Sequence, residues 1–165
     1  MLMKTINILT GPVQSGKTTR LIAWVKYHRH CAGILSPVIN NQRFIYSILA
    51  NEYRRLDSSD DQIIDVDIVK IGKYSFLQST FVWAREELQT AMENKPSYLV
   101  IDEIGPLELS GKGLEPMFTK IVQEYKRTEK HYLILVVREN LLNEVISHYN
   151  LQDLYTTDHN FLTTP

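Results

Sequence analysis

The sequence has little of several features that mark particular classes of protein. Its 165 residues include one cysteine, Cys31, which excludes an internal disulfide framework, and they contain no CxxC pair or Cys/His cluster. The longest apolar run, Tyr132 to Val137, is far shorter than the about 20 residues that a membrane-spanning helix needs. We therefore expect no membrane partner and a reducing, cytoplasmic location. We also expect Cys31 to be a small packed residue and not a catalytic thiol.

Charge of either sign is also not in excess. The formal net charge is -1, from 18 Lys and Arg against 19 Asp and Glu, so no overall field favours binding to nucleic acid or to an anionic membrane. The composition is otherwise ordinary, with 44% hydrophobic and 22% charged residues. The length suits one domain, residues 1–165, with room for a real core. A protein partner is neither indicated nor excluded.

Apolar segments of strand length alternate with amphipathic segments of helix length through most of the chain. Strands are expected at 6–9, 32–38, 63–71, 98–101 and 132–137, and helices from Lys17, behind Ser75, from Leu114 and from Leu141. Residues 39–42 have turn chemistry before 43–48, which predicts a β-hairpin. Ser75 and Gln78 fit a capping box for the helix that ends near Asn94. The pattern predicts a three-layer α/β fold, in which helices cover both faces of a mostly parallel sheet beside a small β-hairpin.

Residues 11–18 read GPVQSGKT and match the pattern G-x-x-x-x-G-K-[ST] between an expected strand and an expected helix. Glycines let such a loop curl so that successive N–H groups, and the N-terminus of the next helix, face a polyphosphate. We expect Lys17 to reach the β- and γ-phosphates and the Thr18 hydroxyl to bind Mg²⁺. The candidate nucleotide-binding residues are Gly11, Pro12, Val13, Gln14, Ser15, Gly16, Lys17, Thr18 and Thr19. The alternative, a glycine turn that only caps a helix, does not explain this context.

Residues 99–109 read LVIDEIGPLEL, with two adjacent carboxylates where an apolar run ends. Burying them is costly unless something compensates their charge, and a Mg²⁺ ion held with Thr18 would do so for Asp102, directly or through water. Asp102 follows a parallel strand and is therefore expected at the same sheet edge as the loop. Glu103 points elsewhere and is the candidate to hold and polarise a water molecule. The alternatives are surface charges at a strand end and, for Glu103, a capping or hinge role.

These stretches together resemble one family. GPVQSGKTT, IGKYSF at 71–76 and VIDEIGPLEL at 100–109 resemble the small cancer-related nucleoside-triphosphatases, a family also found in thermophiles. The resemblance implies a single-domain P-loop enzyme with a RecA-like core, which hydrolyses ATP, GTP, CTP and UTP with Mg²⁺ and little base selectivity. It also assigns catalytic roles to Lys17 and Glu103 and metal binding to Thr18 and Asp102.

Two departures from the family pattern lead us to expect a diverged subfamily. Pro106-Leu107 stands where the family usually has a Lys-Met pair, and residues 33–38 lack an acidic residue that the family tends to have there. The phosphate chemistry does not depend on either position. The departures concern the nucleoside pocket and any second substrate.

Two other functions stay open. A small-molecule or nucleotide kinase shares this loop, but kinases of this size generally carry arginines in a lid, and the candidate lid regions 57–62 and 105–113 have none. A nucleotide-binding switch with slow turnover is the second alternative, because unassisted P-loop proteins hydrolyse slowly.

Three basic residues and a few aromatic ones have open roles. Arg138 follows the strand ending at Val137; a solvated arginine, or one paired with Glu139, is favoured over a role at the phosphates. Arg43 is expected to be exposed on the hairpin, and Lys112 to belong to a helix entry. The aromatic residues that we considered as a base-stacking platform, and expect to be mostly core, are Tyr74, Phe76, Trp83 and Tyr98.

Overall fold

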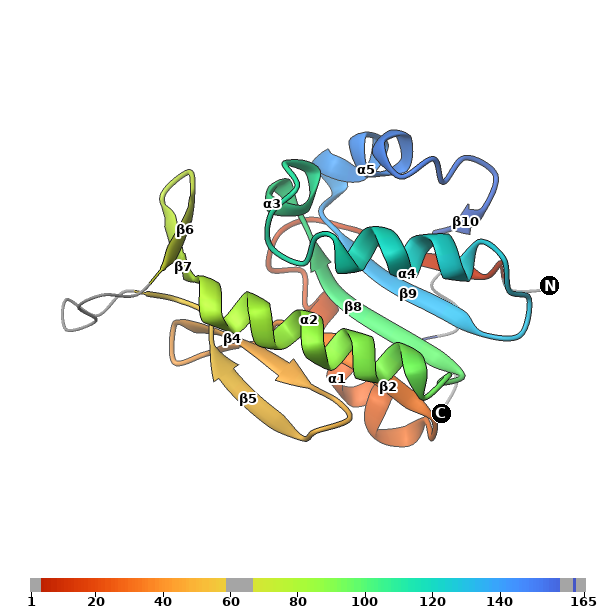
Figure 1. The fold of residues 1–165 in the computed structure, drawn as a ribbon, viewed down its shortest axis with the longest axis horizontal. Helices are drawn as coiled ribbons and strands as arrows, with labels where there is room; N and C mark the ends of the chain where they lie inside the picture. The colour runs from red at the N-terminus through yellow and green to blue at the C-terminus, as the bar shows by residue number, and fades with distance from the viewer. Residues whose placement is uncertain (1–3, 59–66, 158–161, 163–165) are drawn as a thin grey trace.

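The computed structural model describes residues 4–58, 67–157 and 162, and its centre is one eight-stranded sheet (Figure 1). The strands run in the order β10-β1-β9-β8-β2-β4-β3, with β5 paired to β4. From β10 to β2 all neighbours are parallel, and the β3, β4 and β5 edge is antiparallel. The strands are β1 (Ile6–Leu9), β2 (Cys31–Leu35), β3 (Val38–Ile39), β4 (Gln42–Ser47), β5 (Glu52–Arg55), β8 (Tyr98–Ile104), β9 (Tyr132–Val137) and β10 (Tyr155–Thr156).

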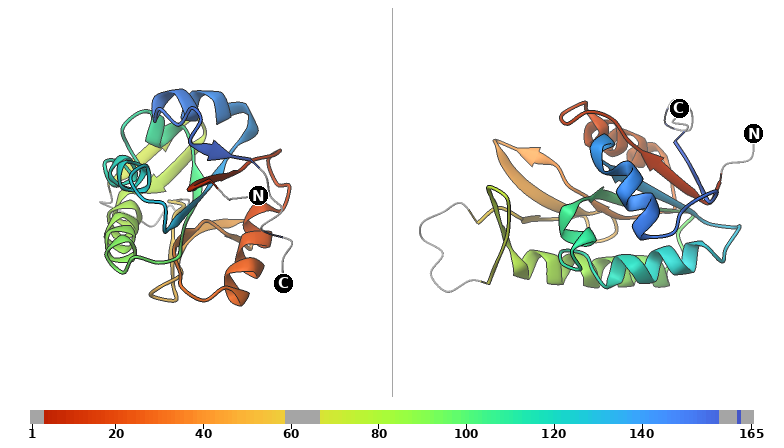
Figure 2. Two further views of the ribbon diagram at one scale, coloured as in Figure 1. Left: turned by 90° about the vertical axis from the view of Figure 1, so that its right-hand side faces the viewer. Right: turned by 90° about the horizontal axis from the view of Figure 1, so that it is seen from above.

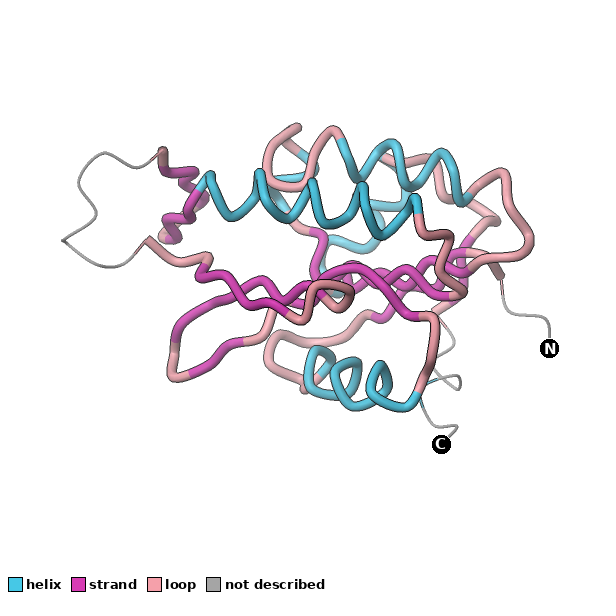
Figure 3. Tube along the Cα trace, turned by 60° about the horizontal axis from the view of Figure 1, so that its bottom comes forward, coloured by secondary structure: helices cyan, strands magenta, loops and turns pink. Residues whose placement is uncertain are grey.

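Helices cover both faces of this sheet, as predicted. Figure 3 shows the three layers, with α1 on one side of the strands and α2 and α4 on the other, and Figure 2 shows the same separation from above. The helices are α1 (Lys17–Tyr27), α2 (Gln78–Glu93), α3 (Pro106–Leu109), α4 (Met117–Tyr125) and α5 (Leu142–His148), with a 3-10 turn, η1, at Glu139–Leu141. None of the helices in the described residues is long and apolar enough to span a membrane.

The central strands are apolar on both sides because both sides are covered. In β9, Leu133 and Leu135 belong to the core under α2, α4 and α5, whereas Ile134 and Val136 belong to the core under α1. Such continuous apolar runs are typical of parallel strands between two helical layers. The alternation fixes the register of the sheet, since a slip of one residue would exchange the two cores.

Gly33 lets β2 approach β8 closely. Its φ is +117°, and a Cβ atom built there would lie 2.0 Å from the carbonyl oxygen of Val100. A side chain at this position would therefore push the two strands apart. The close pairing of β2 with β8 brings the residues after Leu35 next to the end of β8, where the two carboxylates lie.

The predicted hairpin is present and is larger than expected. Asn40 and Asn41 have φ angles of 50° and 60° in the two-residue turn between β3 and β4, which suits a primed hairpin turn. The next strand, β5, extends this antiparallel edge. It was missed because its sequence, EYRR, is mostly exposed and gives no apolar alternation. Of the strand predicted at 63–71, β6 (Ile68–Ile71) is observed, and residues 59–66 lie outside the described residues.

Two predicted boundaries are wrong. Ser75 does not cap α2, because it lies within β7 (Tyr74–Leu77), which pairs with β6 around the turn at Gly72. The helix begins at Gln78 without a side-chain cap. The strand predicted to end at Ile101 continues through both carboxylates to Ile104, because the chain keeps pairing with β9 across a bulge.

Candidate active site

Three loops meet at the edge of the sheet where β1, β8 and β9 end. Because β1 and β8 both run parallel to β9, their carboxyl ends lie at the same edge, as predicted for the phosphate loop and the carboxylates. The loop 10–16 follows β1, Asp102 and Glu103 lie near the end of β8, and Arg138 follows β9. The site is thus assembled by the topology of the sheet.

The phosphate loop has the backbone that a tight anion-binding turn requires. Gln14 has a φ of 58° and Gly16 a φ of 80°, so the chain twice enters the left-handed region before α1 begins. In this conformation successive N–H groups can form a concave anion site. Of the nine predicted nucleotide-binding residues, Lys17 is buried and Gly11 and Thr18 are half-buried. The remaining six, Pro12, Val13, Gln14, Ser15, Gly16 and Thr19, are exposed.

The Lys17 side chain folds back into this loop. Its Nζ donates to the carbonyl oxygens of Gly11 and Pro12 at 3.0 and 2.6 Å and to Ser15 Oγ at 3.1 Å. Three acceptors hold the ammonium group in the concavity of the loop, and only 9% of the residue is exposed. The ammonium charge therefore lies inside the curve of the loop.

Asp102 is a buried carboxylate with one oxygen left over. It is 1% exposed, its Oδ2 accepts a hydrogen bond from the Ser36 amide at 3.3 Å, and the Ser36 hydroxyl donates to its carbonyl oxygen. Its Oδ1 has no hydrogen-bond partner among the described residues. Burial raises the pKa of Asp102 to about 6, while hydrogen bonds from Thr18 and Ser36 and the charge of Lys17 act in the opposite direction.

The free oxygen of Asp102 and the Thr18 hydroxyl fit a Mg²⁺ ion. A buried acceptor without a donor costs about 1–3 kcal/mol, which a cation would recover. Mg²⁺ is usually held by one or two carboxylates together with substrate phosphates and water. Consistent with so sparse a ligand set, the described residues include no group of three or more His, Cys, Asp or Glu that could hold a metal.

Glu103 points away from Asp102 and pairs with Arg138. The register of β8 against β9 shifts between Asp102 and Ile104, and a bulge of this kind re-aims the side chain within it. Arg138 Nε lies 2.8 Å from Glu103 Oε1, and both side chains are a little under a third exposed. The expectation of a solvated Arg138, or one paired with Glu139, is therefore wrong: the guanidinium group belongs to the site.

Sequence reasoning missed two polar residues. Ser36 orients Asp102, and the signal for it was its place directly after the strand beside β8. Glu108 is 4% exposed, and its carboxylate accepts hydrogen bonds from the amides of Gly105 and Leu114, both at 3.0 Å. Burial raises its pKa to about 7, against the effect of these amides. Glu108 thereby ties the loop after β8 together; its three-residue spacing from Gly105 was the available signal.

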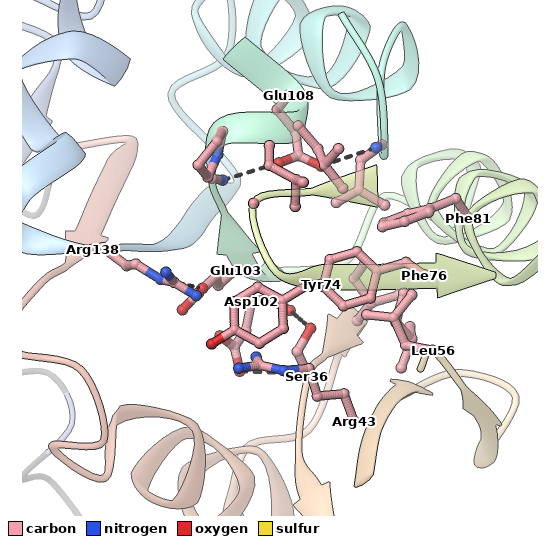
Figure 4. A pocket seen from close by; sticks show the side chains of 18 of the residues that line it. Ser36, Arg43, Leu56, Tyr74, Phe76, Phe81, Asp102, Glu103, Glu108 and Arg138 are labelled. Atoms are coloured by element: carbon pink, nitrogen blue, oxygen red, sulfur yellow. Dashed lines mark hydrogen bonds and ion pairs between the residues drawn. The ribbon is translucent and has the colours of Figure 1, made fainter. Parts of the chain in front are cut away.

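A pocket of about 410 Å³ opens beside the two carboxylates (Figure 4). Glu103 and Arg138 lie at one end, Phe76 and Phe81 at the other, and Tyr74 between them. Tyr74 and Phe76 therefore line a cavity, whereas Trp83 and Tyr98 are not among its walls. Lys112 lies on a second pocket with Arg85, and not on the one that contains the carboxylates.

The chain is similar to known proteins in its family and in its fold. A family model described as NTPase matches residues 7–160. The crystal structure of THEP1 from the hyperthermophile Aquifex aeolicus superposes with a TM-score of 0.69 at 16% identity, covering 92% of this chain and 87% of that chain. The solution structure of a human cancer-related nucleoside triphosphatase gives a TM-score of 0.62 at 18% identity, with 97% and 92% covered. A search of curated proteins found no match.

The two kinds of comparison show different things. Solved structures at so low an identity show the fold alone, and they confirm the α/β P-loop architecture that the sequence predicts. The family model spans nearly the whole sequence, so it also shows membership and confirms the predicted resemblance. Membership implies nucleotide substrates and hydrolysis of nucleoside triphosphates in general. The chain belongs to the NTPase family.

Proposed function

We propose that this protein is a Mg²⁺-dependent nucleoside triphosphatase that transfers the γ-phosphoryl group to water with little selectivity for the base. The observation that carries the proposal is the position of the half-buried Thr18 beside the buried Asp102 carboxylate, whose Oδ1 has no hydrogen-bond partner among the described residues, next to the loop that holds Lys17. A nucleotide bound in this loop would lie next to three groups at the same edge of the sheet: the Lys17 ammonium, the metal site at Thr18 and Asp102, and the Glu103 carboxylate.

The loop and Lys17 bind the triphosphate. The backbone of residues 11–16 and the N-terminus of α1 face the phosphates, and Lys17 gives up its contacts with the loop carbonyls to reach the β- and γ-phosphates. Exchanging neutral carbonyl partners for phosphate oxygens strengthens the hydrogen bonds of the ammonium group, because charge-assisted pairs are the stronger ones. Lys17 also opposes the negative charge that develops during transfer.

Asp102 and Thr18 would hold the metal ion, which would supply positive charge to the transferred phosphoryl group. Ser36 fixes the Asp102 carboxylate by donating to Oδ2, which leaves Oδ1 for the metal or for a water molecule bound to it. Asp102 would hold the cation as the ionised carboxylate, since a ligating carboxyl group is deprotonated.

Glu103 positions the attacking water and accepts its proton. Its carboxylate is partly exposed and lies beside the site, not inside the metal cradle, so it can meet a water molecule in line with the γ-phosphate. Arg138 orients Glu103 through their ion pair, and its guanidinium group is close enough to this edge to stabilise charge as an arginine supplied in cis.

Little base selectivity follows from a site in which phosphate contacts supply the recognition. The nine candidate nucleotide-binding residues form one strand-to-helix junction that addresses the triphosphate, and the family resemblance implies the same breadth for ATP, GTP, CTP and UTP. Turnover without a partner is expected to be slow, as for other P-loop proteins.

The test is inorganic phosphate release from ATP, GTP, CTP and UTP, measured with Mg²⁺ and with excess EDTA. The proposal predicts release from all four nucleotides with rates within about tenfold of each other, and none with EDTA. Release from one nucleotide only would contradict the breadth of selectivity. Tight Mg²⁺-nucleotide binding without any release would contradict hydrolysis.

A further inference from the structure

We propose that the pocket beside the carboxylates, named here the acceptor pocket, is a second substrate site, which binds a nucleoside monophosphate as phosphoryl acceptor. The inference rests on the proposed function, because it uses the same bound triphosphate and the same metal. It adds a further activity: transfer of the γ-phosphoryl group to a monophosphate as well as to water.

The acceptor pocket lies across the carboxylates from the phosphate loop. None of residues 11–19 lines it, whereas Asp102, Glu103 and Arg138 do. Its other walls come from β2, β4, the β6–β7 hairpin, the start of α2 and the loop 105–114. Because Asp102 and Glu103 line this pocket, a triphosphate held by the loop and Asp102 would have the pocket beside its γ-phosphate, and in-line transfer requires the attacking group opposite the leaving oxygen.

The size of the acceptor pocket exceeds what hydrolysis needs. Its volume is about 410 Å³, within the range of small-molecule sites. A single attacking water molecule takes up only about 30 Å³. The remaining space is bounded by apolar side chains, among them Ile34, Ile45 and Leu56, which would gain nothing from enclosing water.

The walls suit a flat ring. The rings of Tyr74 and Phe76 are parallel to within 5°, with centroids 5.9 Å apart, and Phe81 meets Phe76 edge-on at 6.1 Å. All three line the acceptor pocket (Figure 4). Stacking of a nucleobase on such aromatic side chains stabilises binding and depends little on which base it is, because every base has a π-face. An aromatic ligand is therefore favoured over an aliphatic one.

Two cations on the same wall select for an anion. The Arg43 guanidinium lies 4.8 Å from the centroid of the Tyr74 ring, and the Lys73 ammonium lies 5.4 Å from it. Neither forms an ion pair with a described residue, whereas Arg138 is already paired with Glu103. A ligand that combines a flat base with a phosphate group could stack on the Tyr74 ring and pair with Arg43 and Lys73.

The acceptor phosphate also accounts for the chemistry. A dianionic monophosphate attacks through one of its own oxygens, forming a bond to the γ-phosphorus while the bond from that phosphorus to the β,γ-bridging oxygen breaks. The products are two nucleoside diphosphates, and no proton has to be removed. Transfer therefore does not need a general base, in contrast to hydrolysis.

Arginines at this site come from unexpected elements. The candidate lid regions 57–62 and 105–113 contain none, which counted against a kinase. Arg43 comes from β4, and Arg138 comes from the end of β9; both line the acceptor pocket. In small kinases, arginines on a mobile lid close over the two substrates. In this protein the corresponding cations lie on a strand and at the end of a strand.

The test uses ATP, Mg²⁺ and isotopically labelled AMP, GMP, CMP or UMP, with mass spectrometry to detect labelled diphosphate. The proposal predicts labelled diphosphate from at least one monophosphate with the native protein. Tyr74→Ala should reduce its formation about tenfold through lost stacking. Arg43→Gln tests the same site without removing a ring. The matched control is Tyr53→Ala, an aromatic residue on β5 that is 49% exposed and outside the acceptor pocket, which should change nothing.

Release of inorganic phosphate without monophosphate, measured in parallel, separates the two claims. Phosphate release with no labelled diphosphate from any monophosphate would overturn the acceptor pocket and leave hydrolysis standing. Equal losses in Tyr74→Ala, Arg43→Gln and Tyr53→Ala would overturn it as well. Labelled diphosphate without any phosphate release would support the acceptor pocket and overturn hydrolysis.

Discussion

The phosphate loop and the acceptor pocket meet at Asp102, yet they are built in opposite ways. The loop is one run of consecutive residues between β1 and α1, and its working groups are backbone amides and one lysine. The residues that line the acceptor pocket are spread along the sequence from Ile34 to Arg138 and come from several strands, helices and loops. The residues proposed to bind phosphate are therefore placed by local sequence, whereas those proposed to select the acceptor are brought together only by the whole fold.

Lys17→Ala, which alters the phosphate loop alone, should have a large effect on activity and little effect on stability. Loss of a preorganised cation at the transferred phosphate is expected to lower turnover by about 10²–10³-fold. The carbonyls of Gly11 and Pro12, which it leaves free, lie near solvent and can bond to water. Phosphate release and thermal unfolding measure the two effects. Lys26→Ala, exposed near the end of the same helix, is the control. A large drop in the unfolding temperature that accompanies the loss of turnover would show that Lys17 is needed to hold the fold and not only to contact the phosphates.

Asp102 lies where the loop and the acceptor pocket meet. Asp102→Asn should weaken Mg²⁺ binding without lowering the stability of the protein. Asparagine keeps an oxygen for the Ser36 amide but loses the charge that attracts Mg²⁺. The Mg²⁺ concentration for half-maximal activity should rise by about 10–100-fold.

Stability of the nucleotide-free Asp102→Asn protein should not fall at pH 7.5. Burial raises the pKa of Asp102 to about 6 from 3.8, so the folded state disfavours the charged form that is present at that pH. A Mg²⁺ titration of activity and urea unfolding test both statements. Asp153→Asn, at an exposed position, is the control. An unchanged Mg²⁺ requirement would remove Asp102 from the metal site.

Arg138→Ala should lower phosphate release by about tenfold, the equivalent of one charge-assisted hydrogen bond. The variant removes the partner that orients Glu103 and a cation at the edge of both regions. Arg138→Lys, which keeps the charge without the planar fork, should recover part of the loss. If the Arg138→Ala protein hydrolyses nucleotide as fast as the native protein, or faster, then Arg138 does not assist catalysis and pairs with Glu103 only in the absence of nucleotide.

Glu108→Gln should have the smallest effect on activity and a clear effect on the pH dependence of stability. The pKa of Glu108 is raised by burial from 4.5 to about 7, so the unfolded chain loses this proton first as pH rises. The native protein should therefore lose about 2–3 kcal/mol of stability between pH 4.5 and 7 from this group. Removing the group should flatten that decline.

Urea unfolding at pH 5, 6, 7 and 8 measures the slope. At low pH the Glu108→Gln protein itself should be about 1–3 kcal/mol less stable, because its NH₂ group faces the amide of Gly105 or Leu114. Glu144→Gln, exposed on α5, should leave the slope unchanged. A decline as steep as that of the native protein would show that Glu108 does not carry the proton described.

The sequence was sufficient for the parts of the molecule that depend on local pattern. The loop 11–18, the strands β1, β2, β8 and β9 and the spacing of Asp102 from the loop follow from apolar runs and one motif, whereas the two-residue strand β10 does not. The errors lie where long-range pairing decides. Ser75 reads as a helix cap, yet β6 draws it into a strand, and β8 continues past Ile101 because β9 offers further hydrogen bonds.

The acceptor pocket could not be predicted for the same reason. Phe76 is a core residue and Tyr74 packs against the core, as the sequence indicates, but nothing in the sequence shows that both rings also line a pocket. Arg138 looked solvated because its partner, Glu103, is 35 residues away in sequence. Glu108 gave only a weak local signal, since its burial depends on Leu114 and the turn that leads there.

Asp102 and Glu103 are proposed to have separate roles: Asp102 binds the metal ion, and Glu103 positions the attacking water molecule and accepts its proton. The most direct test is Glu103→Gln, with turnover and nucleotide affinity measured on the same preparation with Mg²⁺. The variant keeps the shape of the side chain and removes the base. Phosphate release should fall by about 10²–10⁴-fold while the dissociation constant of the nucleotide stays close to that of the native protein. Undiminished release, or a loss of affinity as large as the loss of turnover, would contradict these roles.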